Sequence, residues 1–320
     1  MRILFITATR IGDAVLSTGL LAHLVAAYPT ARFTVACGPD AAPLFAAVPR
    51  LDRVIPVVKK PYAGHWVALW RACAPHAWEV VVDLRRSAIA WLLRAKVRRV
   101  FPGDMRPVHK VVSLARALGL DDPPSPRLWL GEAQRAAAAE LVPPGAPVLA
   151  LGPGANWPPK RWAPRRFAAL AERLTAADGL LPGGRVAVLG GPGDRDEARP
   201  LLESIPPHRL IDLVGRIDVL TVSAVLRRCA LFVGNDSGLM HIAAASGIPT
   251  LGLFGPSRED VYGPWGPLAA SVRTRETWAA LGGEAGFPGA GPVTLMDGLT
   301  VEAAEAAARA LWQRARAAAA

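Results

Sequence analysis

The stretch that decides the fold covers residues 231–257 and reads LFVGNDSGLMHIAAASGIPTLGLFGPS. It opens with a short apolar run, Leu231–Gly234, of the kind that forms a buried parallel strand. The alanine-rich residues 239–246 predict a helix, and a second apolar run at Thr250–Phe254 predicts another strand. Polar turn residues follow each apolar run. The stretch therefore predicts a strand, a helix and a strand of a parallel sheet, with polar side chains at the carboxyl ends of the strands.

The polar residues of this stretch, Asn235, Asp236, Ser237, Gly238 and His241, gather at the start of the predicted helix. In open parallel sheets, ligands bind beyond the carboxyl ends of the strands, where helix N-termini present unpaired N–H groups. A helix N-terminus carries roughly half a positive charge and favours a phosphate. The alternative is that Asp236 or Ser237 only caps the helix. Because one cap needs one side chain, the whole set favours an anion site.

Strand and helix patterns alternate along the rest of the chain, and a proline-rich break divides them. Before the break, strands are predicted at 1–7, 32–37, 53–58, 79–84 and 97–101, and helices at 12–28, 41–47, 65–73, 87–95 and 108–118. Periodicity fails over residues 119–147. After the break, strands are predicted at 148–151, 185–189 and 209–213, and helices at 164–177, 195–203 and 219–229. Residues 265–292 resemble a loop, and 301–319 predict an alanine-rich helix.

This alternation predicts an α/β protein with two doubly wound parallel-sheet domains of Rossmann-like type, residues 1–145 and 146–320, facing a central cleft. The terminal helix could pack on either domain. At 320 residues and 52% hydrophobic content, the chain can bury two medium cores. Cys37, Cys73 and Cys229 show no metal-ligand spacing and are expected to be buried thiols of a cytoplasmic protein. We expect neither a signal peptide nor a membrane span.

The formal charge of +11 is concentrated in the first domain. Residues 1–145 contain 19 Lys and Arg against 10 Asp and Glu, whereas residues 146–320 contain 18 against 16. The densest basic residues are Lys59, Lys60, Arg85, Arg86, Arg94, Lys96, Arg98 and Arg99. A basic face attracts nucleic acid, an anionic membrane surface or an acidic substrate, or is simply a solvated face.

The first strand-to-helix turn, residues 8–13, reads ATRIGD and lacks the GxGxxG pattern of dinucleotide-binding folds. Asp13 lies in the first turn of the predicted helix, at the carboxyl end of a strand. Its carboxylate could take a proton from an acceptor hydroxyl, a role worth roughly 10²–10⁴ in rate. The alternative is an acid that only stabilises the helix dipole.

Two further turns contain residues suited to phosphate or metal binding. Residues 151–162, LGPGANWPPKRW, place Lys160 just before a helix, where it either contacts phosphate oxygens or is an exposed loop lysine. Residues 190–196, GGPGDRD, contain Asp194 and Asp196 in a DxD pattern that either holds a metal or caps a helix. The second interpretation is favoured, and no metal is expected.

Three stretches together resemble the family 9 glycosyltransferases, the ADP-heptose:lipopolysaccharide heptosyltransferase family. They read MRILFITATRIGDAVLSTGLLAHL, PGANWPPKRWAPRRFAALA and GNDSGLMHIAAASGIPTLGLFGPS, and the third is the most specific. The resemblance covers nearly the whole chain. It is closer to the second heptosyltransferase of the inner core than to the first, which has threonines where this chain has Ala155 and Asn156. A threonine–phosphate contact is therefore not expected.

The resemblance implies the GT-B fold and an inverting transfer. Asp13 would be the catalytic base, Lys160 would contact the donor diphosphate, and Asp236 would hold the donor sugar. Residues 213–216 would border the adenine, and Asp194 or Asp196 the ribose. The implied donor-binding set is Lys160, Asp236, Ser237, Gly238, Leu239, His241, Asn156, Gly215 and Asp194. The candidate acceptor-binding set is Arg10, Gly12, Lys59, Lys60, Arg85 and Arg86.

The resemblance thus implies a metal-independent glycosyltransferase of lipopolysaccharide biosynthesis that moves heptose from ADP-heptose to an anionic, lipid-linked inner-core acceptor. It would be cytoplasmic and peripheral at the cytoplasmic face of the inner membrane, and would not bind nucleic acid. Two alternatives stay open. A nucleotide-sugar epimerase or hydrolase would release epimer or free sugar without an acceptor, and a non-catalytic nucleotide- or nucleic-acid-binding module would bind oligonucleotides with a steep salt dependence.

Overall fold

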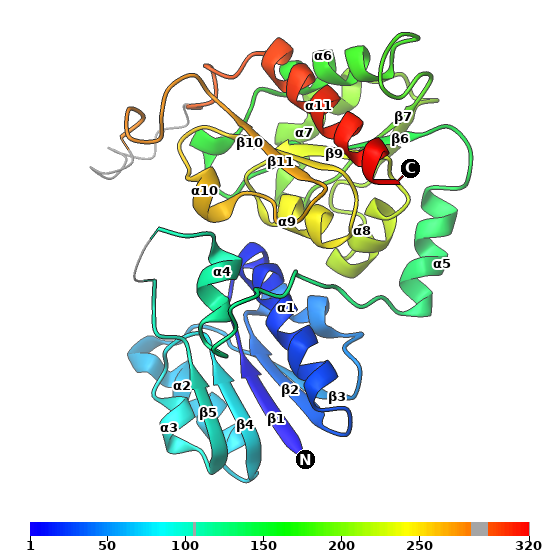
Figure 1. Cartoon of the computed structure of the whole chain (residues 1–320). Coiled ribbons are helices and arrows are strands. Elements are labelled where there is room, and N and C mark those ends of the chain that lie inside the picture. The colour runs from blue at the N-terminus through cyan, green and yellow to red at the C-terminus, as the bar shows by residue number, and fades with distance from the viewer. Residues whose placement is uncertain (105–106, 283–293, 320) are drawn as a thin grey trace. The chain divides into compact units, whose positions relative to one another are not determined.

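The computed structural model describes residues 1–104, 107–282 and 294–319 and contains two compact units, Met1–Gly131 and Glu132–Ala320 (Figure 1). The predicted boundary, between residues 145 and 146, lies one helix later than this division. That helix, α5 (Glu132–Leu141), packs on α8 (Val219–Leu226) of the second unit. Helix α5 was not predicted, because it buries only Ala138 and its alanine-rich surface shows no apolar stripe.

The first unit is a parallel sheet of five strands in the order β3-β2-β1-β4-β5. Its strands are β1 (Arg2–Ile6), β2 (Arg32–Cys37), β3 (Leu51–Pro56), β4 (Trp78–Asp83) and β5 (Ala95–Val100). Its helices are α1 (Ile11–Ala27), α2 (Gly64–Cys73), α3 (Ile89–Leu92) and α4 (Lys110–Ala115), with 3₁₀ turns η1 (Pro39–Phe45) and η2 (Pro61–Ala63). The helix expected over 41–47 is thus a 3₁₀ turn containing Pro43, and the helix expected over 87–95 is a single turn.

Crossovers between parallel strands are right-handed, so the direction in which the chain moves along the sheet decides which face a helix covers. The chain moves from β1 to β2 in one direction, which places α1 on one face (Figure 1). It then moves to β4 and β5 in the other direction, which places α2 and α3 on the opposite face. Packing agrees with this placement. Leu69 of α2 and Ile89 of α3 share a buried cluster with Leu4 and Ile6 of β1. All three cysteines are buried thiols as expected, and burial raises the pKa of the Cys37 thiol to about 12.

The second unit is a parallel sheet of six strands in the order β11-β10-β9-β6-β7-β8. Its strands are β6 (Val148–Gly152), β7 (Arg185–Val188), β8 (Leu210–Asp212), β9 (Leu231–Asn235), β10 (Thr250–Phe254) and β11 (Ala269–Arg273). Its other helices are α6 (Pro164–Thr175), α7 (Arg195–Ser204), α9 (Gly238–Ala245), α10 (Glu259–Tyr262) and α11 (Val301–Ala319), with 3₁₀ turns η3 (Pro158–Lys160) and η4 (Pro192–Asp194). Strand β11 corrects the loop expected over residues 265–292, of which 283–293 lie outside the described residues.

Helices α6, α7 and α11 cover one face of the second sheet, and α8 and α9 cover the other (Figure 1). Trp162, Phe167 and Leu311 belong to one buried cluster with the inward residues of β6 and β9. The terminal helix α11 packs on α6, β10 and β11, and so on its own unit. In each unit the first strand in sequence, β1 or β6, lies inside the sheet and not at its edge. Each sheet therefore has a point where the direction of winding reverses.

Candidate functional site

The reversal point of the second sheet lies between β6 and β9, which pair in register with Gly152 beside Gly234. Open parallel sheets bind ligands beyond the carboxyl ends of the strands at such a point. The loop after β6 contains Asn156 and Lys160, and the turn after β9 contains Asp236 and Ser237. The topology therefore brings together two of the stretches that the sequence singled out.

Lys160 and Asp236 are in direct contact there. The Lys160 Nζ lies 2.6 Å from Asp236 Oδ2 and donates a hydrogen bond to it. The Lys160 side chain is 22% exposed and the Asp236 side chain only 6%. A carboxylate buried this deeply needs a charged partner, because an unpaired buried charge destabilises a protein by several kcal/mol. The pair therefore fixes the ammonium group at the carboxyl edge of the sheet.

Helix α9 starts immediately after this pair, and its first turn has no side-chain cap. Ser237 occupies the N-cap position with an extended backbone (φ −150°, ψ 169°), but its side chain makes no capping bond. Its Oγ is buried and lacks a hydrogen-bond partner among the described residues. The Asp236 carboxylate is bound to Lys160 instead of capping the helix. Neither residue therefore acts as the simple cap that was the alternative interpretation, and Ser237 leaves the first turn of α9 without a side-chain cap.

Asn235 has a different place from the one the sequence suggested. It ends β9 instead of starting the turn, is fully buried, and points toward the loop that contains Lys160. Its Nδ2 donates to the Pro153 carbonyl at 2.5 Å, and its Oδ1 accepts from the Trp162 N–H at 3.2 Å. These two groups are the two ends of the Lys160 loop. Asn235 is therefore a positioning residue, which ties that loop to β9.

The neighbouring loops after β7 and β8 are also connected. Asp194 Oδ2 accepts from the Gly191 N–H at 2.8 Å, so this carboxylate closes the η4 turn as the capping interpretation of the DxD predicted. Gly215 has a left-handed backbone (φ +71°) and donates from its N–H to the Gly190 carbonyl at 2.9 Å. Asp196 points elsewhere, since it is exposed and pairs with Arg199. Among the residues described, no three His, Cys, Asp or Glu side chains form a group that could hold a metal.

Asp194 also borders the Lys160 loop. A Cβ added to Gly154 would lie 2.5 Å from the Asp194 carboxyl carbon, so only glycine allows this approach. On the same side, Arg161 pairs with Glu197 at 2.7 Å and donates from Nε to the Ala155 carbonyl at 2.9 Å. Burial raises the pKa of Glu197, although Arg161 opposes the shift. Sequence reasoning missed this ion pair, because its two residues come from different loops and fit no motif.

In the first unit, Arg10, Gly12 and Asp13 lie at the carboxyl end of β1. Arg10 is exposed at the N-cap position of α1, and Asp13 is half-buried in the first turn of that helix. The sheet reverses its winding between β1 and β4, so these residues occupy the edge where this fold binds ligands. This is the placement that the sequence predicted for Asp13.

Asp83, at the end of the neighbouring strand β4, shapes the basic turn that follows it. Its buried carboxylate accepts from the backbone N–H groups of Arg85 and Ser87 at 2.8 and 2.9 Å. Burial raises its pKa, although these hydrogen bonds oppose the shift. The turn carries Arg85 to the Thr9 hydroxyl, at 3.2 Å, and holds Arg86 in a left-handed conformation (φ 55°). Sequence reasoning did not single out Asp83.

The candidate acceptor residues thus divide into two groups. Arg10, Gly12, Arg85 and Arg86 lie at the ends of the adjacent strands β1 and β4. Lys59 and Lys60 follow β3, which is separated from β1 by β2. Both lysines are exposed.

Comparisons with known proteins agree with this architecture. The family model of glycosyltransferase family 9 (heptosyltransferase) matches residues 66–282, more than half of the chain. Lipopolysaccharide heptosyltransferase 2 of Salmonella typhimurium is 26% identical over 313 residues, which cover 85% of this chain and 88% of the relative.

Two solved structures share the fold over almost the full length. The family 9 glycosyltransferase of Veillonella parvula has a TM-score of 0.81 at 22% identity, covering 98% of this chain and 97% of that one. The E. coli ADP-heptose lps heptosyltransferase II has a TM-score of 0.74 at 22% identity, covering 99% and 100%. The two doubly wound sheets are those of the GT-B fold, as the sequence predicted. The chain belongs to glycosyltransferase family 9, and it is a glycosyltransferase.

Proposed function

We propose that this glycosyltransferase transfers heptose from ADP-heptose to the inner core of a lipopolysaccharide precursor, with inversion at the anomeric carbon. The sugar and acceptor come from the relatives, which are named as lipopolysaccharide heptosyltransferases, and the donor from the E. coli structure named for ADP-heptose. The observation that carries the proposal is the Lys160 ammonium at 2.6 Å from Asp236, beside the uncapped start of α9. This is a site for an anionic leaving group.

The second unit would bind the donor. As the bond from the anomeric carbon to the phosphate oxygen breaks, its electron pair moves to the leaving diphosphate. Preorganised cations and N–H donors at that place lower the barrier. Lys160 would contact the diphosphate, with the N–H groups of Gly238 and Leu239 and the unpartnered Ser237 hydroxyl beside it. Asp236 would offer its other carboxylate oxygen to a sugar hydroxyl.

The other donor residues would act through the loops that surround this pair. Asn156 is exposed on the Lys160 loop, and His241 is buried in α9. Gly215 and Asp194 hold the loops after β8 and β7, where the nucleoside would bind. Because Gly215 has a positive φ, a residue with a side chain at this position would be strained and would displace the loop after β8.

The first unit would bind the acceptor. The Asp13 carboxylate would take the proton of the acceptor hydroxyl as the hydroxyl oxygen attacks the anomeric carbon, a role worth roughly 10²–10⁴ in rate. Arg10, Arg85 and Arg86, with Lys59 and Lys60 farther along the edge, would bind phosphate and carboxylate groups of the acceptor, since arginine forms bidentate bonds with such anions.

We further propose that transfer needs no metal, because Lys160 and the α9 N-terminus supply the positive charge, and that the protein works at the cytoplasmic face of the inner membrane, where its lipid-linked acceptor lies. No helix within the described residues is long and apolar enough to cross a bilayer. We propose that contact with the membrane is peripheral.

The test incubates the protein with ADP-heptose and a lipid-linked inner-core acceptor, with and without a chelator. We expect the acceptor to gain one heptosyl unit by mass spectrometry, an inverted anomeric configuration by NMR, and no effect of the chelator. Release of free heptose without acceptor, or equal use of UDP- and GDP-sugars, would contradict the proposal. Loss of transfer in the chelator would contradict its metal-independent part.

A further inference from the structure

Large hydrophobic side chains are exposed mainly on one part of the first unit. Six of the eight exposed in the described part of the chain fall between Val58 and Leu92. Trp91 is 67% exposed and Leu92 63%, and Trp70 and Val67 are exposed nearby. Single exposed hydrophobic residues are ordinary, but a contiguous group marks an interaction site. We call Val67, Trp70, Trp91 and Leu92, with Tyr62 just before them, the α2–α3 patch.

These residues share one surface because α2 and α3 pack side by side (Figure 1). Leu69, Cys73 and Ile89 point inward and join the core of the sheet. Val67 and Trp70, three residues apart in α2, are exposed beside its buried side. The Trp70 indole N–H donates to the Leu92 carbonyl at 3.3 Å, which ties the outer faces of the two helices together. The patch is therefore a built surface and not a set of unrelated side chains.

The charge around the patch has one sign. Residues 57–78 and 84–103 contain no Asp or Glu, whereas they include Lys59, Lys60 and Arg71 in the first segment and six Lys or Arg in the second. Between them, Glu79 pairs with Lys96 at 3.0 Å and Asp83 is fully buried. The patch thus presents apolar side chains within a positively charged border.

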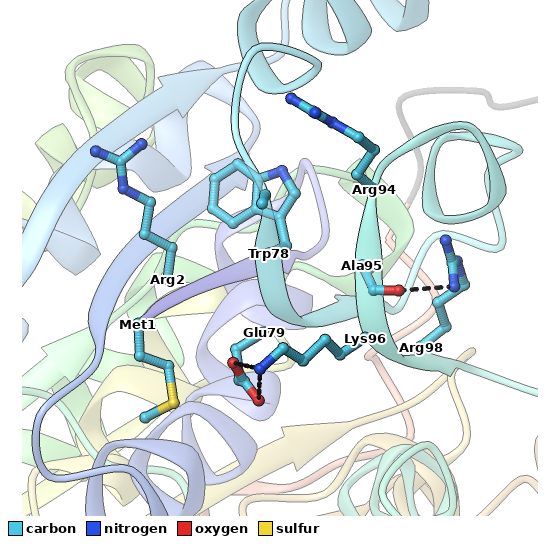
Figure 2. Close-up of a pocket in the computed structure, with 9 residues that line it drawn as sticks. Met1, Arg2, Trp78, Glu79, Arg94, Ala95, Lys96 and Arg98 are labelled. Carbon is cyan, nitrogen blue, oxygen red and sulfur yellow. Dashed lines mark hydrogen bonds and ion pairs between the residues drawn. The ribbon is translucent and has the colours of Figure 1, made fainter.

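Arg94 links the patch to a hollow of about 410 Å³ at the amino ends of β1, β4 and β5 (Figure 2). In this hollow Lys96 is bound to Glu79, and Arg98 donates to the carbonyl oxygens of Ala90, Leu93 and Ala95. Figure 2 shows Arg94 near Trp78 at the hollow; its side chain is exposed and forms no hydrogen bond or ion pair within the described part of the chain. Its charge is therefore available to an anion that approaches the patch.

We propose that the α2–α3 patch docks on an anionic lipid bilayer, with Trp70, Trp91 and Leu92 at the boundary between headgroups and acyl chains and with Arg71 and Arg94 on lipid phosphates. This deepens the proposed function, on which it rests for the lipid-linked acceptor. Tryptophan prefers the membrane interface, and each basic residue near an anionic surface contributes about 1 kcal/mol. The patch combines both features.

Two other occupants fit less well. A second copy docking on the same patch would bring two basic borders together, because a two-fold interface pairs each patch with itself. A nucleic acid would match the charge and could stack its bases on Trp70 and Trp91, but it would leave the aliphatic Val67 and Leu92 without an apolar partner. An anionic bilayer accepts both the aliphatic and the basic groups.

The experiment measures sedimentation of the full chain with vesicles that contain no acceptor. We expect binding to phosphatidylethanolamine–phosphatidylglycerol vesicles and at least about tenfold weaker binding to phosphatidylcholine. The double variant Trp91→Ser, Leu92→Ser should bind the anionic vesicles at least about tenfold more weakly, because it loses the two exposed apolar side chains that the bilayer would bury. Arg94→Gln should weaken binding about fivefold.

Matched controls lie in the second unit. Tyr262→Ser removes an exposed aromatic ring and Arg316→Gln an exposed charge, and both should bind vesicles as the wild type does. Equal binding by the patch variants and the wild type would overturn the proposal. So would equal binding to both lipids, or dimerisation or oligonucleotide binding through the patch without vesicle binding. If the double variant fails to fold, Arg94→Gln decides the outcome.

The two proposals can fail separately. Transfer to a deacylated, water-soluble acceptor should be the same in the Trp91/Leu92 variant and the wild type, whereas transfer to a vesicle-embedded acceptor should fall at least about tenfold in the variant. Vesicle binding without any transfer would contradict the proposed function and leave the docking surface standing. Normal transfer with patch-independent vesicle binding would contradict only the docking surface.

Discussion

The Lys160–Asp236 pair joins two residues far apart in the chain into one polar contact at the sheet edge. Because Asp236 is almost completely buried, its carboxylate depends on Lys160 for a counter-charge. In return it holds a flexible lysine in one place. A phosphate arriving there would meet an ammonium group that is already positioned, so less entropy would be lost on binding.

Replacing Lys160 tests this arrangement. Lys160→Met should weaken ADP binding by about tenfold to a hundredfold, the worth of one charged hydrogen bond. It should also lower the free energy of unfolding by about 3 kcal/mol, because Asp236 is left buried and unpaired. Calorimetry with ADP and urea unfolding measure the two effects.

The double variant Lys160→Met, Asp236→Asn is the control that separates them. It should regain most of the stability, since no unpaired charge remains, while ADP binding stays weak. Recovery of ADP affinity together with stability would show that Lys160 has only a structural role.

Asn235 permits a second test, of positioning. Asn235→Leu leaves the Pro153 carbonyl and the Trp162 N–H without their partner, which should destabilise the protein by about 1–3 kcal/mol and raise the KM for the donor by loosening the Lys160 loop. Thr250→Val is the matched control, since it removes a buried hydrogen bond at the amino end of β10. It should lower stability without changing the KM. An unchanged KM in both variants would contradict the positioning role.

The sequence indicated Lys160, Asp236 and Ser237 as site residues because each follows a predicted strand. It could not show that Lys160 and Asp236 touch, since their contact depends on which strands are neighbours in the sheet. It also could not show that Asn235 points into the protein, because the last residue of a strand and the first residue of a turn look alike. Asp83 and the Arg161–Glu197 pair fit no motif, so only the packing reveals them.

Helices α8 and α9 follow one another in the second unit but begin differently. In α8, the Asp218 carboxylate accepts from the N–H groups of Leu220 and Thr221, at 2.9 and 3.1 Å. In α9, Ser237 makes no such bond. The start of α8 is thus capped by a carboxylate, whereas the side chain of Ser237 does not cap the first turn of α9.

The Asp218 cap predicts a pH effect. Burial raises the pKa of Asp218, but its bonds from the Thr221 hydroxyl and the two N–H groups outweigh burial and lower the pKa below 3.8. A carboxyl whose folded pKa is lowered contributes stability above its unfolded pKa and loses it as the pH falls through the folded pKa. Asp218→Ala should therefore lower the free energy of unfolding by about 1 kcal/mol at neutral pH, and by less near about pH 3.

Urea unfolding at the two pH values measures the effect. Asp218→Asn keeps an acceptor without a charge, so it should retain most of the stability at neutral pH and remove the dependence on acid. An equal loss at both pH values in Asp218→Ala would mean that the carboxylate contributes no charge-dependent stability.

Most elements were predictable because buried strands are apolar and amphipathic helices are periodic. The predictions for β2, β10 and α11 match the structure in both bounds. The missed elements lack these signals or, like α10 and the 3₁₀ turns η2, η3 and η4, are very short. Helix α5 shows no apolar stripe, and β11 lies at the sheet edge with only partly buried residues beside a glycine-rich segment.

Both units are doubly wound, and each has its candidate residues at the carboxyl ends of its own strands. The side chains at the two places differ in chemical type. The first unit offers arginines and one acid, and the second a lysine–carboxylate pair and a free helix start. The excess positive charge of the first unit fits an anionic acceptor, and the nearly balanced second unit fits a donor held by a few directed groups.

This division predicts where ADP protects the protein. In hydrogen–deuterium exchange, ADP should slow the amides of residues 153–161, 190–194 and 236–239, because ligand binding stabilises the segments it contacts. Residues 1–131 should exchange at unchanged rates. Protection concentrated around Arg10 or Arg85 would place the nucleotide in the first unit and contradict the division.

One variant tests both the proposed role of Asp13 in the reaction and the proposed role of the second unit in donor binding. Calorimetry and turnover should be measured side by side on Asp13→Asn. We predict that turnover falls by about 10²–10⁴-fold while the donor dissociation constant changes by less than about twofold. Near-normal turnover with a small loss of stability would mean that Asp13 only stabilises the α1 dipole, and an equal loss of donor affinity would place it in the donor site; either result would contradict the account.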